Sequence, residues 1–209
     1  MTTRAKSNPK ITKPRGIPPR ADSTLVVLPA LLGLQSDIAT CTICPSLKPW
    51  RKFGPEVYGN ASTGYLLVGE APGYVSWRKR RRFTGQAGML IRRALWTVGH
   101  PRYRELEDLF YMTDIVKCHP AASANPSSNR SPRRVEVEAC SSYLLRELQV
   151  LRPSAIVTFG KAAAEAVTRA MKHASASRCM GQTEVIAFPH PSPRNQVTIL
   201  KQYPLHASL

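Results

Sequence analysis

The chain has 209 residues, of which 43% are hydrophobic, and carries a formal net charge of +17. This length predicts one domain with a buried core, and no apolar run approaches the ~18–20 residues that span a bilayer. Thirty Lys and Arg against thirteen Asp and Glu favour a polyanionic partner, most simply a nucleic acid, over a membrane. The first residues hold no apolar stretch typical of a secretory signal, so we expect a cytoplasmic location.

Residues 1–24 are rich in Pro, Lys and Arg, which predicts a disordered basic tail, and residues 25–209 are expected to form one globular domain. Periodicity and capping signals predict helices at 24–35, 88–98, 131–151 and 160–173, with Ser131 as the cap of the third. Short apolar runs predict strands at 65–69, 109–116, 155–159 and 184–188. Strands that alternate with helices indicate an α/β fold, whose site lies beyond the carboxyl ends of the parallel strands.

Five cysteines, an odd number, do not indicate a disulfide scaffold in a chain without a secretory signal. Cys41 and Cys44 form a C-x-x-C pair, whereas Cys118 and Cys140 stand alone. Two separated single cysteines fit a zinc ribbon poorly, and an iron–sulfur cluster tolerates them better. On spacing alone, a metal centre and plain burial of Cys118 and Cys140 remain equal alternatives.

Two loops after predicted strands carry candidate catalytic groups. The turn Gly69–Gly73 holds Glu70 where a carboxylate can orient or deprotonate water, and an exposed loop glutamate is the alternative. This turn lacks the G-x-G-x-x-G pattern, so we expect no nucleotide cofactor. After the last strand, prolines stiffen the loop around His190, which can donate a hydrogen bond to a developing anion or serve a structural role.

A basic run, Arg78–Arg82, leads directly into Phe83 and a glycine turn. Positive charge for phosphates beside a ring for base stacking is typical of a nucleic-acid groove. Ordinary solvated surface, with Phe83 in the core, is the alternative. The residues expected to contact DNA, from this run and from later loops, are Arg80, Arg81, Arg82, Asn129, Arg130, Ser192 and Arg194.

Taken in chain order, these motifs resemble the uracil-DNA glycosylase superfamily, most closely its type 4 and type 5 iron–sulfur branch. The segments that carry the resemblance are Gly69–Gly73, Arg82–Gly88, Thr113–Pro120, Asn129–Pro132, Cys140 and His190–Asn195. The resemblance implies a three-layer α/β/α sandwich with a central four-stranded parallel sheet. It also implies a monomeric enzyme of DNA repair that flips a deaminated base, most simply uracil, out of DNA and hydrolyses its N-glycosidic bond.

The same resemblance assigns roles to individual residues. Glu70 and His190 would be catalytic, the first acting on water and the second on the departing base. The residues implied to contact the base are Gly69, Ala71, Gly73, Phe83 and Asp114. A 4Fe–4S cluster of structural importance would be ligated by Cys41, Cys44, Cys118 and Cys140.

One position departs from the family pattern, because Asp114 stands where the branch commonly has Asn. An ionised aspartate accepts hydrogen bonds but cannot donate them to a uracil carbonyl. Three alternatives follow: Asp114 is protonated, it contacts uracil only at the ring N–H, or the preferred base is one with an exocyclic amino group or hypoxanthine. A purely structural role of Asp114 is a further alternative. A catalytically weak DNA-binding relative that recognises damage and a zinc-stapled nucleic-acid module are the alternatives from other classes.

Overall fold

A computed structural model of the chain describes residues 24–50, 58–122, 125, 127–176, 182–192 and 195. The predicted tail, residues 1–24, lies outside the described part except for Thr24, where the first helix begins. The elements, in chain order, are α1 (Thr24–Thr40), the 3-10 helix η1 (Pro45–Trp50), β1 (Tyr65–Gly69), α2 (Tyr74–Lys79), α3 (Gln86–Val98), α4 (Leu106–Leu109), β2 (Tyr111–Asp114), α5 (Arg134–Leu151), β3 (Ala155–Phe159), α6 (Lys161–Ala176) and β4 (Glu184–Phe188).

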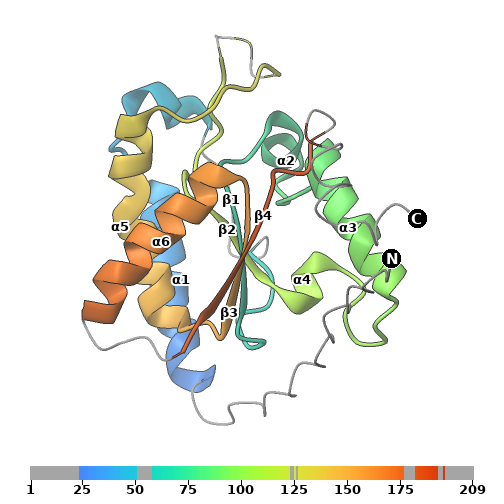
Figure 1. The fold of residues 1–209 in the computed structure, drawn as a ribbon. Helices are drawn as coiled ribbons and strands as arrows, with labels where there is room; N and C mark the ends of the chain where they lie inside the picture. The colour runs from blue at the N-terminus through green and yellow to red at the C-terminus, as the bar shows by residue number, and fades with distance from the viewer. Residues whose placement is uncertain are drawn as a thin grey trace, which may run out of the picture.

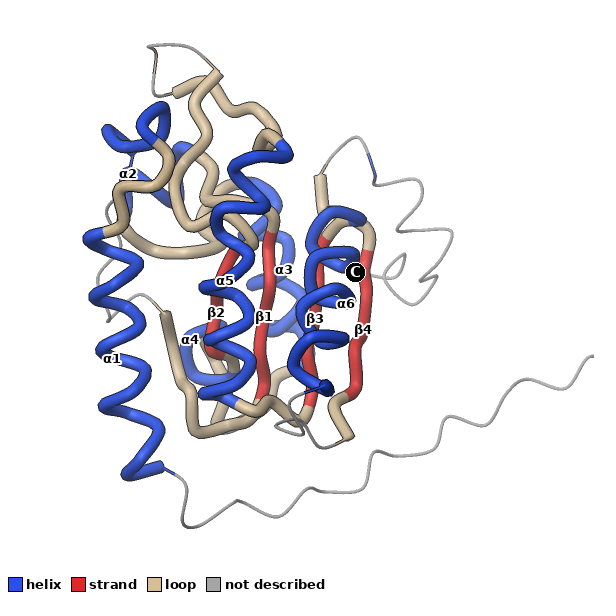
Figure 2. The backbone as a smooth tube through the Cα atoms, turned by 90° about the vertical axis from the view of Figure 1, so that its left-hand side faces the viewer, coloured by secondary structure: helices blue, strands red, loops and turns tan. Residues whose placement is uncertain are grey.

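The strands form a four-stranded sheet in the order β2-β1-β3-β4, and every pairing in it is parallel. Helices α1, α5 and α6 cover one face, and α3 and α4 cover the other (Figure 1). The expected three-layer α/β/α sandwich is therefore confirmed. Because every pairing is parallel, the carboxyl ends of the strands lie at the same end of the sheet, whose strands stand side by side in the order β2, β1, β3 and β4 in Figure 2.

The alternation of side chains along β1 divides the core between the two faces. Leu66 and Val68 belong to the large cluster beneath α1, α5 and α6, together with Ile156 of β3. Leu67, between them, points to the opposite face and packs with Leu106 and Met112. Each of these six side chains is almost fully buried, so both faces of the sheet contribute to the core.

Helices α3 and α6 differ from the expected bounds by one to three residues, and three other elements differ as follows. Helix α1 runs on to Thr40, so it reaches Cys41 directly. Strand β2 is shorter than predicted, because the helical turn α4 occupies Leu106–Leu109 and the chain leaves the strand after Asp114. Helix α5 begins at Arg134 and not at Ser131, because the carboxylate of Glu136 accepts the backbone N–H of Arg133 at 2.7 Å and fixes the first turn there.

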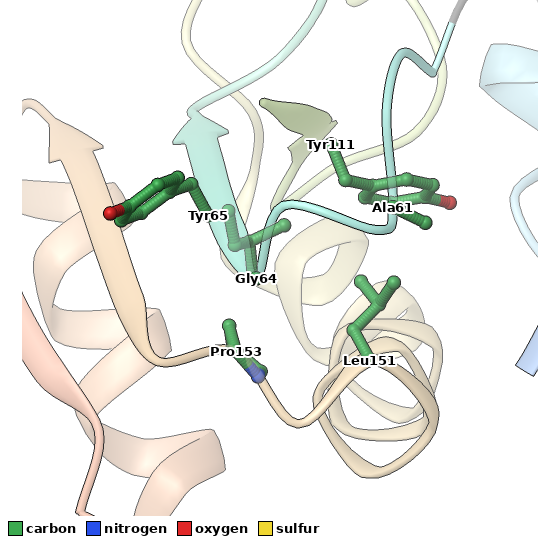
Figure 3. A pocket seen from close by; sticks show the side chains of 7 residues that line it. Ala61, Gly64, Tyr65, Tyr111, Leu151 and Pro153 are labelled. Atoms are coloured by element: carbon green, nitrogen blue, oxygen red, sulfur yellow. The ribbon is translucent and has the colours of Figure 1, made fainter. Parts of the chain in front are cut away.

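Two further features of the described residues bear on function. None of their helices combines the length and the apolar character that crossing a membrane requires. A small crevice at the amino ends of β1 and β3 is lined by Ala61, Gly64, Tyr65, Leu66, Tyr111, Leu151 and Pro153 (Figure 3). That lining carries no carboxylate, imidazole or thiol, whereas the candidate catalytic residues follow the carboxyl ends of the strands.

Candidate active site

The carboxyl ends of the strands bring together residues that are far apart in the sequence. Strand β2 ends at Asp114, and the neighbouring β1 ends at Gly69, directly before Glu70. On the other side of β1, β3 ends at Phe159, and β4 leads to His190 two residues after Phe188. We call Gly69, Glu70, Phe83, Asp114 and His190 the strand-end site.

The loop that carries Glu70 is held by backbone hydrogen bonds on the β2 side. The backbone N–H groups of Ile115 and Val116 donate to the carbonyls of Gly69 and Glu70 at 2.9 and 3.0 Å. Farther along the loop, Nδ1 of the buried His119 lies 2.9 Å from the carbonyl oxygen of Pro72. Glu70 is half-buried, and hydrogen bonds hold the backbone at Glu70 itself and on both sides of it, at Gly69 and Pro72.

Phe83 reaches the site because the turn before α3 adopts an unusual conformation. Its φ is +51°, a left-handed value that is costly for a residue with a side chain. The buried Arg92 of α3 donates to the carbonyl oxygens of Arg82 and Phe83 at 3.0 and 3.1 Å. A Cβ at Gly88 would collide with the backbone of Phe83, so this close packing requires glycine there.

Gly69 is the point where the base-binding candidates meet. A Cβ added at Gly69 would collide with Oδ1 of Asp114 and would lie 3.2 Å from Cζ of Phe83. The absence of a side chain therefore lets the Phe83 ring and one carboxylate oxygen of Asp114 approach the same backbone atom. Of the other two residues expected at the base, Ala71 packs partly buried against the main core and Gly73 lies near Asn129.

The structure corrects the expectation for Arg82. Its side chain is 1% exposed, so it cannot lie against a DNA phosphate in this conformation, and Nη1 donates to Oδ2 of Asp114. Burial opposes the charge of Arg82, but the neighbouring Asp114 raises the guanidinium pKa above its usual value. Burial raises the pKa of the Asp114 carboxyl, while the charges of Arg82 and Lys117 oppose that rise. This pairing could not be predicted from the sequence, because charged residues in a run are normally solvated.

The other residues expected to contact DNA differ in their exposure and in the partners of their side chains. Arg80 is exposed, whereas Arg81 pairs with Glu107 at 2.6 Å and Arg130 pairs with Glu136 at 2.6 Å. Asn129 is exposed, and its Oδ1 accepts the backbone N–H of Tyr74 at 2.9 Å. Ser192 is half-buried, and Arg194 lies outside the described residues.

Arg92 is a positioning residue that the sequence reasoning missed. Besides holding the Phe83 turn, it pairs with Glu105 and Glu107 at 2.8 and 2.7 Å. Burial raises the pKa of Glu107, but hydrogen bonds from Arg92 and Arg81 outweigh it and lower the pKa to about 2. A signal was available, since Arg92 falls on the same helical face as Gly88 and Leu95, where a charge is unexpected.

His190 is exposed, and its loop is tied together locally. Its carbonyl oxygen accepts the N–H of Ser192 at 2.8 Å and the side-chain amide of Asn195 at 3.0 Å. Gly160, with a φ of +94°, leaves room on the β3 side, where its Cβ position would lie 3.5 Å from the Cβ of His190. His190 therefore lies on a loop held by local hydrogen bonds, at the same carboxyl edge of the sheet as Glu70.

Of the four expected cluster ligands, Cys41 and Cys44 follow the end of α1, Cys118 follows β2, and Cys140 lies in α5. Cys44, Cys118 and Cys140 pack in or against the same core cluster, and Cys41 packs against Tyr143 and interacts electrostatically with Cys140. In the part of the chain that is described, no group of three or more His, Cys, Asp or Glu converges as a single metal ion would require. A four-iron cluster binds each thiolate through a different iron, so it does not need that convergence.

A second buried ion pair, also unexpected from sequence, supports the end of β2 beside Cys118. Nζ of Lys117 donates to Glu147 of α5 at 2.6 Å, to Oγ1 of Thr113 at 2.7 Å and to the carbonyl of Asp114 at 2.8 Å. The side chains of Lys117 and Glu147 are 2% and 0% exposed. This network joins α5, which carries Cys140, to the strand that carries Asp114.

Comparison with known proteins agrees with this geometry. The family model described as "Uracil DNA glycosylase superfamily" matches residues 56–206. The chain is 37% identical over 134 residues to a type-4 uracil-DNA glycosylase of Pyrobaculum aerophilum, covering 64% of this chain and 62% of that protein, so it spans less than two thirds of that relative. It is 33% identical to the type-4 enzyme of Archaeoglobus fulgidus, covering 75% of this chain and 78% of that one. It is 32% identical to a type-5 uracil-DNA glycosylase of Pyrobaculum aerophilum, covering 76% and 80% of the two chains. The motifs, the all-parallel sheet and these matches agree, and the chain belongs to the uracil DNA glycosylase superfamily.

Proposed function

We propose that this protein is a DNA glycosylase that removes uracil from DNA and leaves an abasic site. The observation that carries the proposal is the strand-end site, where Glu70 and His190 follow parallel strands of one sheet and Phe83 closes on Gly69 beside Asp114. Removal of another base, such as hypoxanthine, is a second candidate, because the carboxylate of Asp114 stands where the branch commonly has an amide. The protein acts as a monomer on DNA in this proposal.

Access to the base comes first. The target nucleotide leaves the stack, which costs a few kcal/mol that contacts with DNA must supply. The net charge of +17 and the exposed Arg80 support phosphate binding, and Asn129 and Ser192 lie near the same end of the sheet. The flipped base stacks on the ring of Phe83, above Gly69.

The reaction then breaks the bond between the base nitrogen and C1′ of the sugar. The bonding electrons leave with the base as an anion, which a hydrogen bond from His190 stabilises, an effect of ~3–4 kcal/mol for comparable oxyanion donors. The sugar becomes cationic, as in other glycosidic cleavages. Glu70 stabilises that cation and takes a proton as water adds to C1′, and solvent returns a proton to the base.

The thiols of Cys41, Cys44, Cys118 and Cys140 hold a 4Fe–4S cluster in this proposal. Two observations support it: Cys118 and Cys140 are buried in one core cluster, and Cys41 interacts with Cys140. Thiolates are the ligands that such clusters take. The cluster would serve as a cross-link, because its ligands come from the end of α1, from the segment after β2 and from α5. We assign it no step in base removal.

The test uses cluster-loaded protein and labelled oligonucleotides that carry uracil or hypoxanthine, single-stranded and in duplex. Abasic sites are scored by alkaline cleavage under single-turnover conditions. We expect strand cleavage at uracil, and a loss of ~10²-fold or more in Glu70→Gln and His190→Ala. Iron and sulfide near four each per chain are expected from the proposed cluster, whereas one zinc would contradict it.

A matched control separates catalysis from folding. Glu138→Gln removes an exposed carboxylate of α5 that pairs with Arg134, and it should leave the rate unchanged. Tight DNA binding without cleavage of either base would replace the glycosylase by a damage-binding protein. Cleavage at hypoxanthine alone would assign the second candidate.

A further inference from the structure

The loop that carries Glu70 is tied to the segment after β2 at three points. Two of them are backbone hydrogen bonds of 2.9 and 3.0 Å, to the carbonyl oxygens of Gly69 and Glu70. The third comes from a side chain, because Nδ1 of His119 lies 2.9 Å from the carbonyl oxygen of Pro72. A carbonyl oxygen only accepts, so Nδ1 carries the proton and donates it. The third tie therefore depends on which side chain stands at position 119.

The carboxylate of Glu70 depends on the backbone of this loop. In the part of the chain that is described, no hydrogen bond or ion pair holds that carboxylate, and the residue is only half-buried. Its place is therefore set by the course of the loop, and Pro72 lies two residues farther along. A displacement of about 1 Å in a group that acts on the reacting atoms can slow a reaction by ~10²-fold.

His119 can hold the loop because its own side chain is fixed. The residue is 0% exposed, and its ring stacks on the indole of Trp77 with the ring centroids 5.6 Å apart. The ring of Trp50 meets it edge-on at 6.2 Å, and the backbone N–H of His119 donates to the carbonyl oxygen of Trp50 at 3.2 Å. If the imidazole turned away, the carbonyl of the buried Pro72 would lose this donor, which is unfavourable inside a protein.

We propose that His119 is a positioning residue for base removal, an inference that rests on the proposed glycosylase function. It acts through the loop backbone, which keeps the carboxylate of Glu70 in place, and not on the base or the sugar. The imidazole also joins two cysteine-bearing segments to the catalytic loop. Trp50 ends η1, which follows Cys44, and His119 itself follows Cys118. The packing of both segments thus bears on the position of Glu70.

The test compares two variants of nearly the same shape in the full, cluster-loaded chain. The amide of Asn places an N–H at the same point along the side chain as Nδ1 of His119, whereas Leu has no donor. At matched iron content and folded fraction, we expect His119→Leu to slow single-turnover uracil removal by about 10- to 100-fold and His119→Asn to stay within about threefold of the wild type. His100→Leu is the matched control, because His100 is an exposed histidine after α3 and should not change the rate.

Affinity separates positioning from a general loss of structure. Duplexes with 2′-fluoro-deoxyuridine resist cleavage and report binding alone. Their affinity should fall far less than the rate does in His119→Leu, because the exposed basic residues are unchanged. If His119→Leu does not fold, His119→Phe takes its place, since it keeps a ring against Trp77 and also lacks the donor.

Hydrogen exchange tests the tie without relying on activity. The peptide that spans residues 69–74 should exchange at least about tenfold faster in His119→Leu than in His119→Asn, while the other peptides exchange alike. If no base is cleaved but exchange differs in this way, the glycosylase proposal fails and His119 still holds the loop. With an active enzyme, equal rates for the two variants, equal exchange, or a fall in affinity as large as the fall in rate overturns the inference.

Discussion

Thr113 and Asp114 are neighbours in β2, yet their side chains serve opposite faces of the sheet. Thr113 turns toward α5, where its hydroxyl donates to Glu147 at 2.9 Å within the Lys117 network. Asp114 turns toward the α3 side, where it meets Arg82 and lies beside Gly69 and Phe83. Both are buried ion-pair networks, but only the second places a carboxylate oxygen, Oδ1 of Asp114, beside the proposed base-binding residues. We call the α5 side, with Thr113, Lys117 and Glu147, the scaffold face. We call the α3 side, with Asp114 and Arg82, the recognition face. The end of β2 joins the two.

The largest expected effect is on the scaffold face. Lys117→Met removes the cation from a Glu147 side chain that is 0% exposed, so an uncompensated carboxylate remains inside the protein. We expect the free energy of unfolding to fall by about 3–5 kcal/mol, as measured by denaturant titration of cluster-loaded protein. Adding Glu147→Leu should restore most of it, because neither charge then remains. If Lys117→Met unfolds at the wild-type midpoint, the network contributes no net stability and the comparison fails.

On the recognition face, Arg92→Met should affect stability less than Lys117→Met does, and activity more. Arg92→Met removes the donors that hold the Phe83 turn at a positive φ. We expect a loss of about 1–3 kcal/mol in stability and of about 10- to 100-fold in single-turnover rate, because the stacking ring loses its position. Arg93→Met, the exposed neighbour on α3, is the control. Equal rates for both variants would show that the turn holds Phe83 without Arg92.

The fold could be predicted from the sequence where the local pattern and burial agree. Strand β4 has the predicted bounds, Glu184–Phe188, because an apolar run between turn residues suits a strand in a parallel sheet. Helix α1 was predicted too short, since Ser36, Asp37 and Thr40 carry no apolar periodicity, although the helix continues through them. The motif residues at the strand ends, such as Glu70 and Asp114, could be placed because the strands before them were predicted from their apolar runs.

The ion pairs at the end of β2 could not be predicted from the local sequence pattern. Arg82 and Asp114 are 32 residues apart, and Lys117 and Glu147 are 30 apart, so only the folded sheet reveals their pairing. From composition alone, a run of arginines is expected to be solvated, and that expectation failed for Arg82 because Asp114 and Tyr58 enclose it. The family pattern pointed to Asp114 as unusual, but it did not point to its partner.

The smallest expected effect is a difference in acid stability between the two faces. Glu147 is fully buried, whereas the Glu107 side chain is 20% exposed and can exchange protons with solvent. The folded-state pKa of Glu107 is about 2, below its ordinary value of 4.5. A lowered carboxyl pKa stabilises the folded state above pH 4.5, and that contribution is lost as the pH falls from 4.5 toward 2.

Glu107→Gln should therefore lower Tm at neutral pH and flatten the fall of Tm between pH 4.5 and pH 2.5, a window set by the pKa of Glu107. Thermal unfolding followed by far-UV circular dichroism measures both effects. Glu138→Gln is the control, because Glu138 forms an exposed pair with Arg134 and should leave the slope unchanged. Equal slopes for Glu107→Gln and the wild type would mean that protonation of Glu107 does not loosen the Arg92 network.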